Sequence, residues 1–263
     1  MVTRRAASAG RPTVLVTGAA GGVARLLLSG LGAAYTLRLT DRRPFPGAVV
    51  GDLCDAGFAR RVCAGVDAVV HLAADADPDQ PWQQLCDPNA TAVVNVLDAA
   101  VAAGVPRVVL ASSLHAMGGH VDAGQTEIGE DMPPYPCCTY GALKVLAENV
   151  GRLYADVHRL RVVCLRLGGV LDQPPARSWL PGWLSGPDLV RLVTAALTAE
   201  VRYGIYHGVS ANSFRTWRND RARTELGYEP LDDSATYAGQ VPDDLTETSS
   251  HQAGIRQRIL HLT

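Results

Sequence analysis

The 263-residue sequence lacks any apolar run long enough to span a lipid bilayer. Its formal net charge is only −2, so composition gives no reason to expect nucleic acid or an anionic membrane as a partner. Residues 1–12 are basic but lack the apolar stretch of a signal peptide, and we expect a disordered N-terminal tail there. These absences favour a protein that acts on a small molecule.

The six cysteines lack C-x-x-C spacing and are scattered through predicted helices and strands. This pattern argues against a zinc or disulfide framework, and we expect no metal. Cysteines used as small apolar core residues are typical of a reducing compartment, so we expect a cytoplasmic protein. A role for Cys137 and Cys138 in lining a site, just ahead of Tyr140, is left open.

Short β-rich runs alternate with helical patterns along the first two thirds of the chain. Predicted strands fall at 13–17, 36–40, 67–72, 107–111 and 161–167, and predicted helices at 23–31, 85–103 and from 138 onward. Such β-α-β repeats predict an α/β fold, with a Rossmann-type doubly wound parallel sheet over residues 13–168. The pattern is looser beyond that point, and we expect residues 169–263 to form a small substrate-binding cap interleaved with the core.

A glycine-rich turn follows the first predicted strand. Gly18, Gly21 and Gly22 open a helix at Val23, in a G-x-x-G-x-x-A pattern that ends at Ala24. Glycine allows a tight turn and a close approach of backbone N–H groups to a pyrophosphate, and the helix N-terminus favours its negative charge. The turn therefore predicts a dinucleotide site.

The end of the second predicted strand indicates which dinucleotide is used. Asp41 follows Gly18 by 23 residues. A carboxylate there accepts hydrogen bonds from the adenosine ribose hydroxyls and repels a 2′-phosphate, which favours NAD over NADP. Arg42 and Arg43 keep NADP open as the less favoured cofactor, because an arginine at this place can hold a 2′-phosphate.

Further cofactor contacts are expected where ligands bind on parallel sheets, at the carboxyl ends of strands. Leu72, Ala73 and Ala74 stand at the end of the predicted strand 67–72. Asp52 and Leu53 follow another predicted strand and are placed to contact the adenine. The agreement of these positions with the glycine turn supports a single ligand-binding edge of the sheet.

Tyr140 and Lys144 stand one helical turn apart, 27 residues after Ser113. Positions i and i+4 share a helix face, so we expect the Lys144 ammonium to lower the pKa of the Tyr140 phenol towards neutrality. Such a tyrosine can exchange a proton with a substrate oxygen that Ser113 holds. We predict these three as catalytic residues, with Tyr140 and Lys144 also contacting the cofactor. The alternative, an amphipathic helix with both residues at its rim, is disfavoured by the glycine turn.

Together these segments resemble the extended short-chain dehydrogenase/reductase family, the NAD-dependent epimerases and dehydratases. The matching segments are 16–21, 51–53, 71–74, Asn89, 112–113, 140–144, 148–149 and 166–168. The resemblance implies a Rossmann domain, a nicotinamide cofactor that Asn89 also contacts, and a Ser-Tyr-Lys catalytic set. It further implies a homodimer or higher homo-oligomer, assembled through the helices near 85–103 and 138–157.

Within that family the sequence is most similar to the uronate dehydrogenases, which oxidise the anomeric hydroxyl of a hexuronate with NAD. This resemblance implies substrate contacts by Asp75, Leu114, His115, Gly169 and Arg177. Leu114 and Gly169 replace an asparagine and a serine of the pattern, so recognition of a polyhydroxylated ring should be weakened. Arg177 either grips a substrate carboxylate or is an ordinary surface arginine.

Three functions remain open at this point. The first is an NAD-dependent dehydrogenase or ketoreductase acting on a small hydroxylated, possibly carboxylated or sugar-derived, substrate. The second is a nucleotide-sugar epimerase or dehydratase that uses tightly bound NAD. The third is a non-catalytic dinucleotide-sensing protein, which would need none of Ser113, Tyr140 and Lys144. The intact catalytic set and the short cap favour the first.

Overall fold

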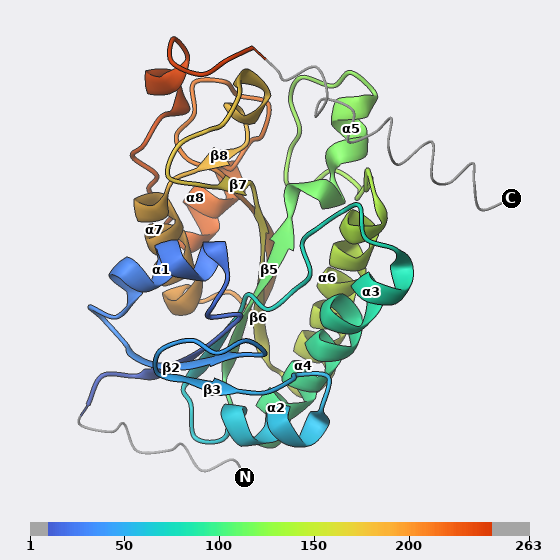
Figure 1. Ribbon diagram of the computed structural model, residues 1–263, viewed down its shortest axis with the longest axis vertical. Coiled ribbons are helices and arrows are strands. Elements are labelled where there is room, and N and C mark those ends of the chain that lie inside the picture. Colours follow the sequence, from blue (N-terminus) through green and yellow to red (C-terminus); the bar gives the residue numbers. More distant parts are fainter. Residues whose placement is uncertain (1–9, 244–263) are drawn as a thin grey trace, which may run out of the picture.

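The computed structural model describes residues 10–243. A seven-stranded parallel sheet with the strand order β3-β2-β1-β4-β5-β6-β9 runs through its centre (Figure 1). The order reverses between β1 and β4, which confirms the predicted doubly wound Rossmann-type fold. Most of the predicted N-terminal tail, residues 1–12, lies outside the described residues.

The strands are short and come at the places that the β-rich runs predict. The central sheet contains β1 (Thr13–Thr17), β2 (Thr36–Asp41), β3 (Ala48–Val50), β4 (Ala68–His71), β5 (Arg107–Ser113), β6 (Arg161–Leu167) and β9 (Tyr203–Gly208). A separate pair is formed by β7 (Gly169–Val170) and β8 (Trp183–Leu184).

Helices cover both faces of the sheet (Figure 1). One layer contains α2 (Ala56–Cys63), α4 (Ala92–Ala102) and α6 (Thr139–His158), and the other α1 (Gly22–Leu31), α7 (Gly186–Thr198) and α8 (Asp220–Leu226). The shorter α3 (Trp82–Cys86) and α5 (Gly118–Asp122) lie at the rim. The predicted helix 85–103 is interrupted by a π-helical turn, Asp87–Thr91, which contains Pro88. Proline lacks the N–H of a regular helical bond, so the register changes there.

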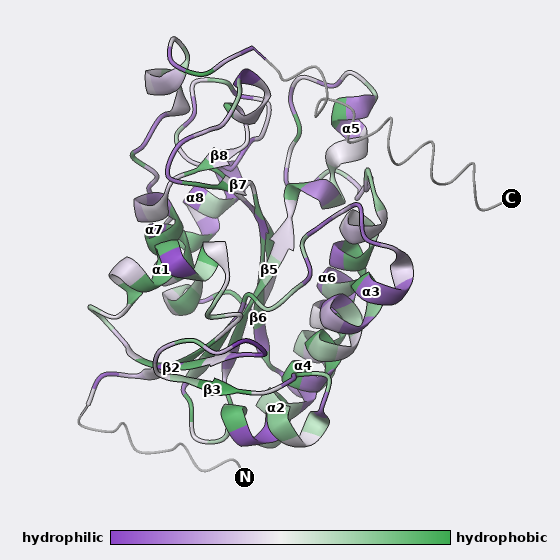
Figure 2. Cartoon of the chain, in the orientation of Figure 1, coloured by the Kyte–Doolittle hydropathy of each residue, from purple (hydrophilic) through white to green (hydrophobic). Residues whose placement is uncertain are grey.

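Both faces of the strands are buried, which is why their sequences read as continuous apolar runs. Leu15 of β1 packs under α2 and α4, whereas its neighbours Val14 and Val16 pack under α1 and α7. Each such side chain contributes roughly 1.5–3 kcal/mol when it is fully removed from water. Figure 2 shows this arrangement as hydrophobic central strands flanked by helices in which hydrophobic and hydrophilic residues are mixed.

The part of the chain after residue 168 contributes to two places. Strand β9 pairs with β6, and α7 packs on α1 and the sheet, so both belong to the Rossmann core. The β7–β8 pair and the segments that follow β9 lie at the carboxyl ends of the central strands (Figure 1). The sheet therefore extends past residue 168, and the interleaved substrate-binding cap over residues 169–263 stays a prediction. Among the described residues no helix is both long and apolar enough to cross a membrane.

Candidate active site

The glycine turn between β1 and α1 is shaped by the close approach of a neighbouring loop. Gly18 has φ +70, and a Cβ at this position would lie 2.7 Å from the backbone nitrogen of Ala73. The turn closes with a hydrogen bond of 2.9 Å from the Gly21 N–H to the Gly18 carbonyl. Both the left-handed backbone and the packing against Ala73 require glycine. Gly18 and Gly21 of this turn line an open groove.

This groove is a cavity of about 580 Å³, here called the Asp41 groove. Most of the predicted cofactor contacts line it. These are Gly18, Gly21, Asp41, Arg42, Asp52, Leu53, Leu72, Ala73 and Ala74. Asp75, which was predicted to contact substrate, lines this groove as well. The shape and the lining fit the adenosine part of a dinucleotide, since glycines lie at one end and a carboxylate at the end of β2.

Asp41 is fixed within this groove by three contacts with two residues, Ala20 and Arg43. Its Oδ2 accepts a hydrogen bond of 2.9 Å from the Ala20 N–H, and its Oδ1 accepts one of 2.8 Å from the Arg43 N–H. The Arg43 guanidinium lies 3.6 Å from the same Oδ1 and also donates to the Ala20 carbonyl. The carboxylate therefore stands at the glycine turn with a defined orientation, and Arg43 is held beside it.

A second cavity of about 630 Å³, here called the Tyr140 cavity, adjoins the first. Gly18, Gly21, Leu72 and Ala74 line both cavities, so the two join around the glycine turn. Gly22 and Val23 line its near end. The predicted catalytic residues Ser113, Tyr140 and Lys144 and the predicted substrate contacts Leu114, His115 and Gly169 line the rest. A ligand that extends from the Asp41 groove into the Tyr140 cavity would therefore reach the predicted catalytic residues.

The three predicted catalytic residues come from two elements. Ser113 ends β5, and Tyr140 and Lys144 lie on the first turns of α6, with the Lys144 Nζ 5.3 Å from the centre of the Tyr140 ring. Tyr140 and Ser113 are joined by a hydrogen bond. The helical spacing therefore places the lysine and the phenol on one face, as predicted.

The electrostatics of the pair differ from the prediction. Burial raises the pKa of Tyr140 to about 12, and the hydrogen bond with Ser113 only partly offsets this. The prediction that Lys144 lowers the pKa of Tyr140 towards neutrality is therefore wrong for this arrangement, because desolvation of the phenolate is the largest effect on that pKa. Burial also lowers the pKa of Lys144 to about 8, while Glu148 raises it.

A buried ion pair lies directly behind these residues, and the sequence analysis assigned it no role. Arg166 of β6 donates to both carboxylate oxygens of Glu148 at 2.8 Å, and both side chains are 1% exposed. Ser112 donates to the same carboxylate at 2.6 Å. Glu148 lies one helical turn beyond Lys144, so this pair fixes α6 against β5 and β6 where the catalytic residues stand.

Two of the predicted site residues, Asn89 and Arg177, line neither of the two cavities. Asn89 is fully buried in the π-helical turn and donates to the carbonyls of Asp75, at 2.9 Å, and Leu85, at 3.0 Å. Its contact with the cofactor stays a prediction. Arg177 is absent from the described lining of the Tyr140 cavity, and its guanidinium pairs instead with Asp243 at 3.0 Å and with the Ala238 carbonyl.

Several apolar residues line the Tyr140 cavity that the sequence analysis did not assign to the substrate site. The larger ones include Val121, Trp179 and Trp217. Trp179 lies over Gly169, where an added Cβ would be 2.6 Å from its indole ring. The indole therefore occupies the space that a serine side chain would need. For Trp179, its place in a glycine- and proline-rich segment was the available indication.

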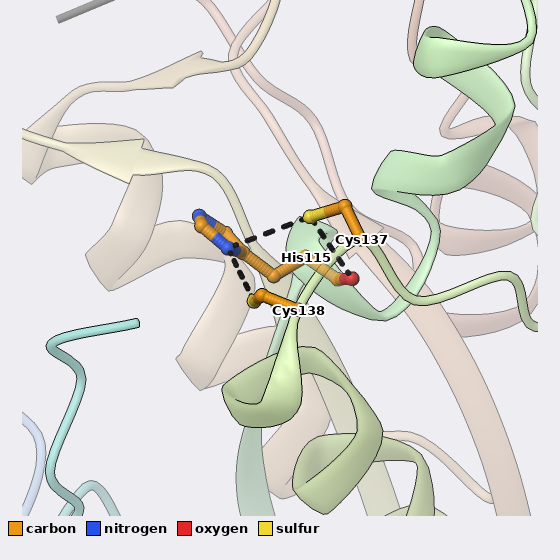
Figure 3. A group of neighbouring side chains, drawn as sticks. All are labelled: His115, Cys137 and Cys138. Carbon is orange, nitrogen blue, oxygen red and sulfur yellow. Dashed lines mark hydrogen bonds between the residues drawn. The ribbon is translucent and has the colours of Figure 1, made fainter. Parts of the chain in front are cut away.

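Cys137 and Cys138, whose role was left open, stand at the entrance to α6 and face His115. The Nδ1 atom of His115 lies 3.3 Å from the Cys138 sulfur and 3.7 Å from the Cys137 sulfur (Figure 3). Cys137 also lines the Tyr140 cavity. A hydrogen bond from the Cys137 thiol holds the pKa of Cys138 well below its usual range, and His115 acts in the same direction.

Comparison with known proteins agrees with this geometry. The NAD dependent epimerase/dehydratase family matches residues 14–171. The chain is 35% identical over 257 residues to the NAD-dependent glucose-6-phosphate dehydrogenase of Haloferax volcanii, covering 88% of this chain and 98% of that protein. It is 33% identical over 237 residues to the uronate dehydrogenase of Pseudomonas putida, covering 87% of each.

A solved structure shows the same fold with a nucleotide. A mutant uronate dehydrogenase from Agrobacterium tumefaciens, complexed with NAD, has a TM-score of 0.81 and 29% identity, and the match covers 91% of this chain and 93% of that one. The chain therefore belongs to the NAD dependent epimerase/dehydratase family. This confirms the predicted resemblance to the extended short-chain dehydrogenases/reductases, with uronate dehydrogenases among its relatives.

Proposed function

We propose that this protein is an NAD-dependent dehydrogenase that oxidises a hydroxyl group of a sugar-derived molecule. The observation that carries the proposal is the meeting of Ser113, Tyr140 and Lys144 in the Tyr140 cavity, which joins the Asp41 groove around the glycine turn. Relatives named for oxidising glucose 6-phosphate and uronate support a sugar-derived substrate. The family name and the placement of Asp41 support NAD as the cofactor.

The residues divide the work in a way that follows from their positions. A substrate hydroxyl placed between Ser113 and Tyr140 would be held by the serine and give its proton to the deprotonated Tyr140 oxygen. Lys144, whose Nζ lies 5.3 Å from the centre of the Tyr140 ring, would stabilise the phenolate that accepts this proton. Bound NAD would take up hydride from the carbon that carries the hydroxyl. Because burial keeps Tyr140 protonated at neutral pH, we expect alcohol oxidation to accelerate as the pH rises.

The lining of the Tyr140 cavity favours a neutral substrate. Among the described residues that line it, Lys144 is the one lysine or arginine, and it is buried beside the tyrosine. Arg177, the candidate carboxylate anchor, is paired with Asp243. Leu114, Trp179 and Trp217 offer apolar or aromatic surface in place of hydrogen-bonding groups. We therefore propose a neutral aldose or cyclic alcohol with fewer hydroxyls or a bulkier apolar group, and weak activity on glucuronate and galacturonate.

The test is NAD reduction by the purified protein against matched panels of neutral aldoses, cyclic alcohols, uronates and glucose 6-phosphate. Tyr140→Phe should abolish most turnover and leave NAD binding nearly unchanged, because the phenol acts in the chemical step. Tyr35→Phe is the matched control, since Tyr35 lies outside both cavities. Wild-type rates in the Tyr140→Phe variant would refute the assigned role, and a kcat/KM on uronates above that on every neutral substrate would refute the neutral pocket.

We further propose a homodimer in a reducing cytoplasm. Leu146, Leu153 and Val157 of α6 are 39%, 58% and 62% exposed, and Trp82 of α3 is 51% exposed. The three α6 residues recur at helical spacing, so they form an outward apolar stripe of the kind that a two-fold pairing of helices would cover.

All six cysteines are free thiols and form no disulfide, which supports a reducing compartment.

A further inference from the structure

Three side chains with metal-binding atoms converge at the wall of the Tyr140 cavity. His115 lies in the 3-10 turn Leu114–Ala116 that follows β5, whereas Cys137 and Cys138 end the loop that leads into α6. Figure 3 shows both sulfurs pointing to the same ring nitrogen of His115. The two sulfur atoms and the Nδ1 atom all lie within 4.8 Å of one another.

The spacing of these atoms agrees with tetrahedral zinc. Bonds of about 2.3 Å to sulfur and about 2.1 Å to nitrogen, at a tetrahedral angle, place nitrogen and sulfur about 3.6 Å apart. The two observed separations are 3.3 Å and 3.7 Å. Small side-chain rotations therefore suffice to form three bonds to one ion. Two thiolates and an imidazole are ligands that Zn²⁺ prefers.

The backbone holds the three ligands in place independently of any ion. The Cys138 sulfur caps α6 by accepting the Gly141 N–H at 3.3 Å. The Cys137 N–H donates to the His115 carbonyl at 3.2 Å, and an added Cβ on Gly141 would lie 2.2 Å from that same carbonyl oxygen. The turn that carries His115 is thus packed tightly on the start of α6. Ligands on such preorganised segments lose little freedom when an ion binds.

We propose that His115, Cys137 and Cys138 form a binding site for Zn²⁺ or a similarly soft divalent cation. His115 and Cys137 line the Tyr140 cavity, so the fourth coordination position faces the space that the substrate would use. The site lies beside the catalytic residues, because the His115 and Tyr140 rings are 5.6 Å apart and the His115 N–H donates to the Ser113 hydroxyl at 3.2 Å.

A bound ion should affect turnover, an expectation that rests on the proposed function. The ion would narrow the Tyr140 cavity, and its open coordination position would bind a substrate oxygen away from Ser113 and Tyr140. We therefore expect Zn²⁺ to inhibit the dehydrogenase in competition with substrate, and a chelator to restore activity. Metal binding itself requires no turnover, so its measurement separates this proposal from the proposed function.

The experiment uses the full chain without a histidine tag, in the reduced state. Titration with Co²⁺ should produce the sulfur-to-cobalt charge-transfer absorption in the near ultraviolet, and calorimetry with Zn²⁺ should give one ion per chain with a micromolar or tighter Kd. Loss of a partner outside the first coordination shell lowers metal affinity about 10- to 100-fold. Cys137 would bind the ion directly, so Cys137→Ser should lower the Zn²⁺ affinity by about 100-fold or more. Cys138→Ser should do the same, while serine preserves the helix cap.

Cys86→Ser is the matched control, because Cys86 is half-buried and lies outside the described cavities. It should leave metal binding and activity unchanged. Absence of the charge-transfer band in the wild type would overturn the proposal. So would Zn²⁺ affinity that is unchanged in the folded Cys137→Ser and Cys138→Ser variants, with folding checked by circular dichroism.

Discussion

Replacement of Glu148 by glutamine tests whether the buried ion pair behind the active site stabilises the fold. Glutamine has nearly the same shape but no charge. In the native protein the carboxylate accepts two hydrogen bonds from Arg166 and one from Ser112. The variant would retain a single acceptor oxygen, and the Arg166 guanidinium would be left charged at 1% exposure. Because water cannot reach that charge, the loss should be large.

The expected magnitude follows from this burial. Breaking a buried pair from one side costs about 3–5 kcal/mol, whereas an exposed pair contributes roughly 0.2–1 kcal/mol. The same helix offers exposed ion pairs as a control, since Asp156, 49% exposed, pairs with Arg152 at 2.9 Å and with Arg202 at 2.8 Å, and these arginines are 60% and 59% exposed. Asp156→Asn should therefore cost less than about 1 kcal/mol. For a chain of this length the Glu148→Gln loss corresponds to a decrease in Tm of about 10 °C.

Urea unfolding followed by circular dichroism measures both variants against the wild type. A double variant, Glu148→Gln with Arg166→Met, should recover part of the loss, because it removes the unpaired charge. The reasoning is refuted if Glu148→Gln and Asp156→Asn destabilise the protein equally at an unchanged m-value. It is also refuted if the double variant is less stable than Glu148→Gln alone.

Four further outcomes are expected. Lys144 releases its proton near pH 8 in the folded protein but near pH 10.5 in the unfolded chain, so the unfolded chain binds more protons between these values. The free energy of unfolding of the wild type, measured in urea relative to Lys144→Met, should therefore rise by about 3 kcal/mol from pH 8 to 10.5. A difference that does not change with pH would contradict the burial of Lys144. Asp41→Ala should weaken NAD binding and reduce the discrimination against NADP, both measured by fluorescence titration. A wild type that binds NADP more tightly than NAD would contradict this role of Asp41. Gly169→Ser should lower kcat/KM on the best neutral substrate at least about tenfold, because its Cβ would displace Trp179, and an unchanged value would remove the indole from the pocket. Leu153→Glu should convert a dimer to a monomer in light scattering, and a wild type that is already monomeric at micromolar concentration would exclude the α6 interface.

Several features of this protein were determined by local sequence. The alternation of β-rich and helical patterns defines the layers, because strands buried on both faces and amphipathic helices need those patterns whatever their neighbours. The Gly18 turn could be placed because its backbone has φ +70, which glycine adopts without strain. Tyr140 and Lys144 share a face because the helical repeat dictates it. These inferences depend on contacts within a few residues.

Other features were decided by tertiary packing. Burial, which no local spacing encodes, sets the pKa of Tyr140, and so the predicted lowering by Lys144 was wrong. Arg177 found Asp243 as its partner, 66 residues away in the chain. Trp179 lies against Gly169 because the segment between β7 and β8 folds back when these two strands pair.

The group of His115, Cys137 and Cys138 shows most clearly the difference between what local sequence determines and what tertiary packing decides. The sequence shows two adjacent cysteines without metal-binding spacing, and from this we expected no metal. The fold brings the imidazole of His115, 22 residues earlier, to 3.7 Å from the Cys137 sulfur. Sequence patterns detect ligands that lie on one turn or one loop, whereas this group joins the end of a strand to the start of a helix. Only the packing of α6 against β5 brings their side chains together, because the intervening chain loops away and returns.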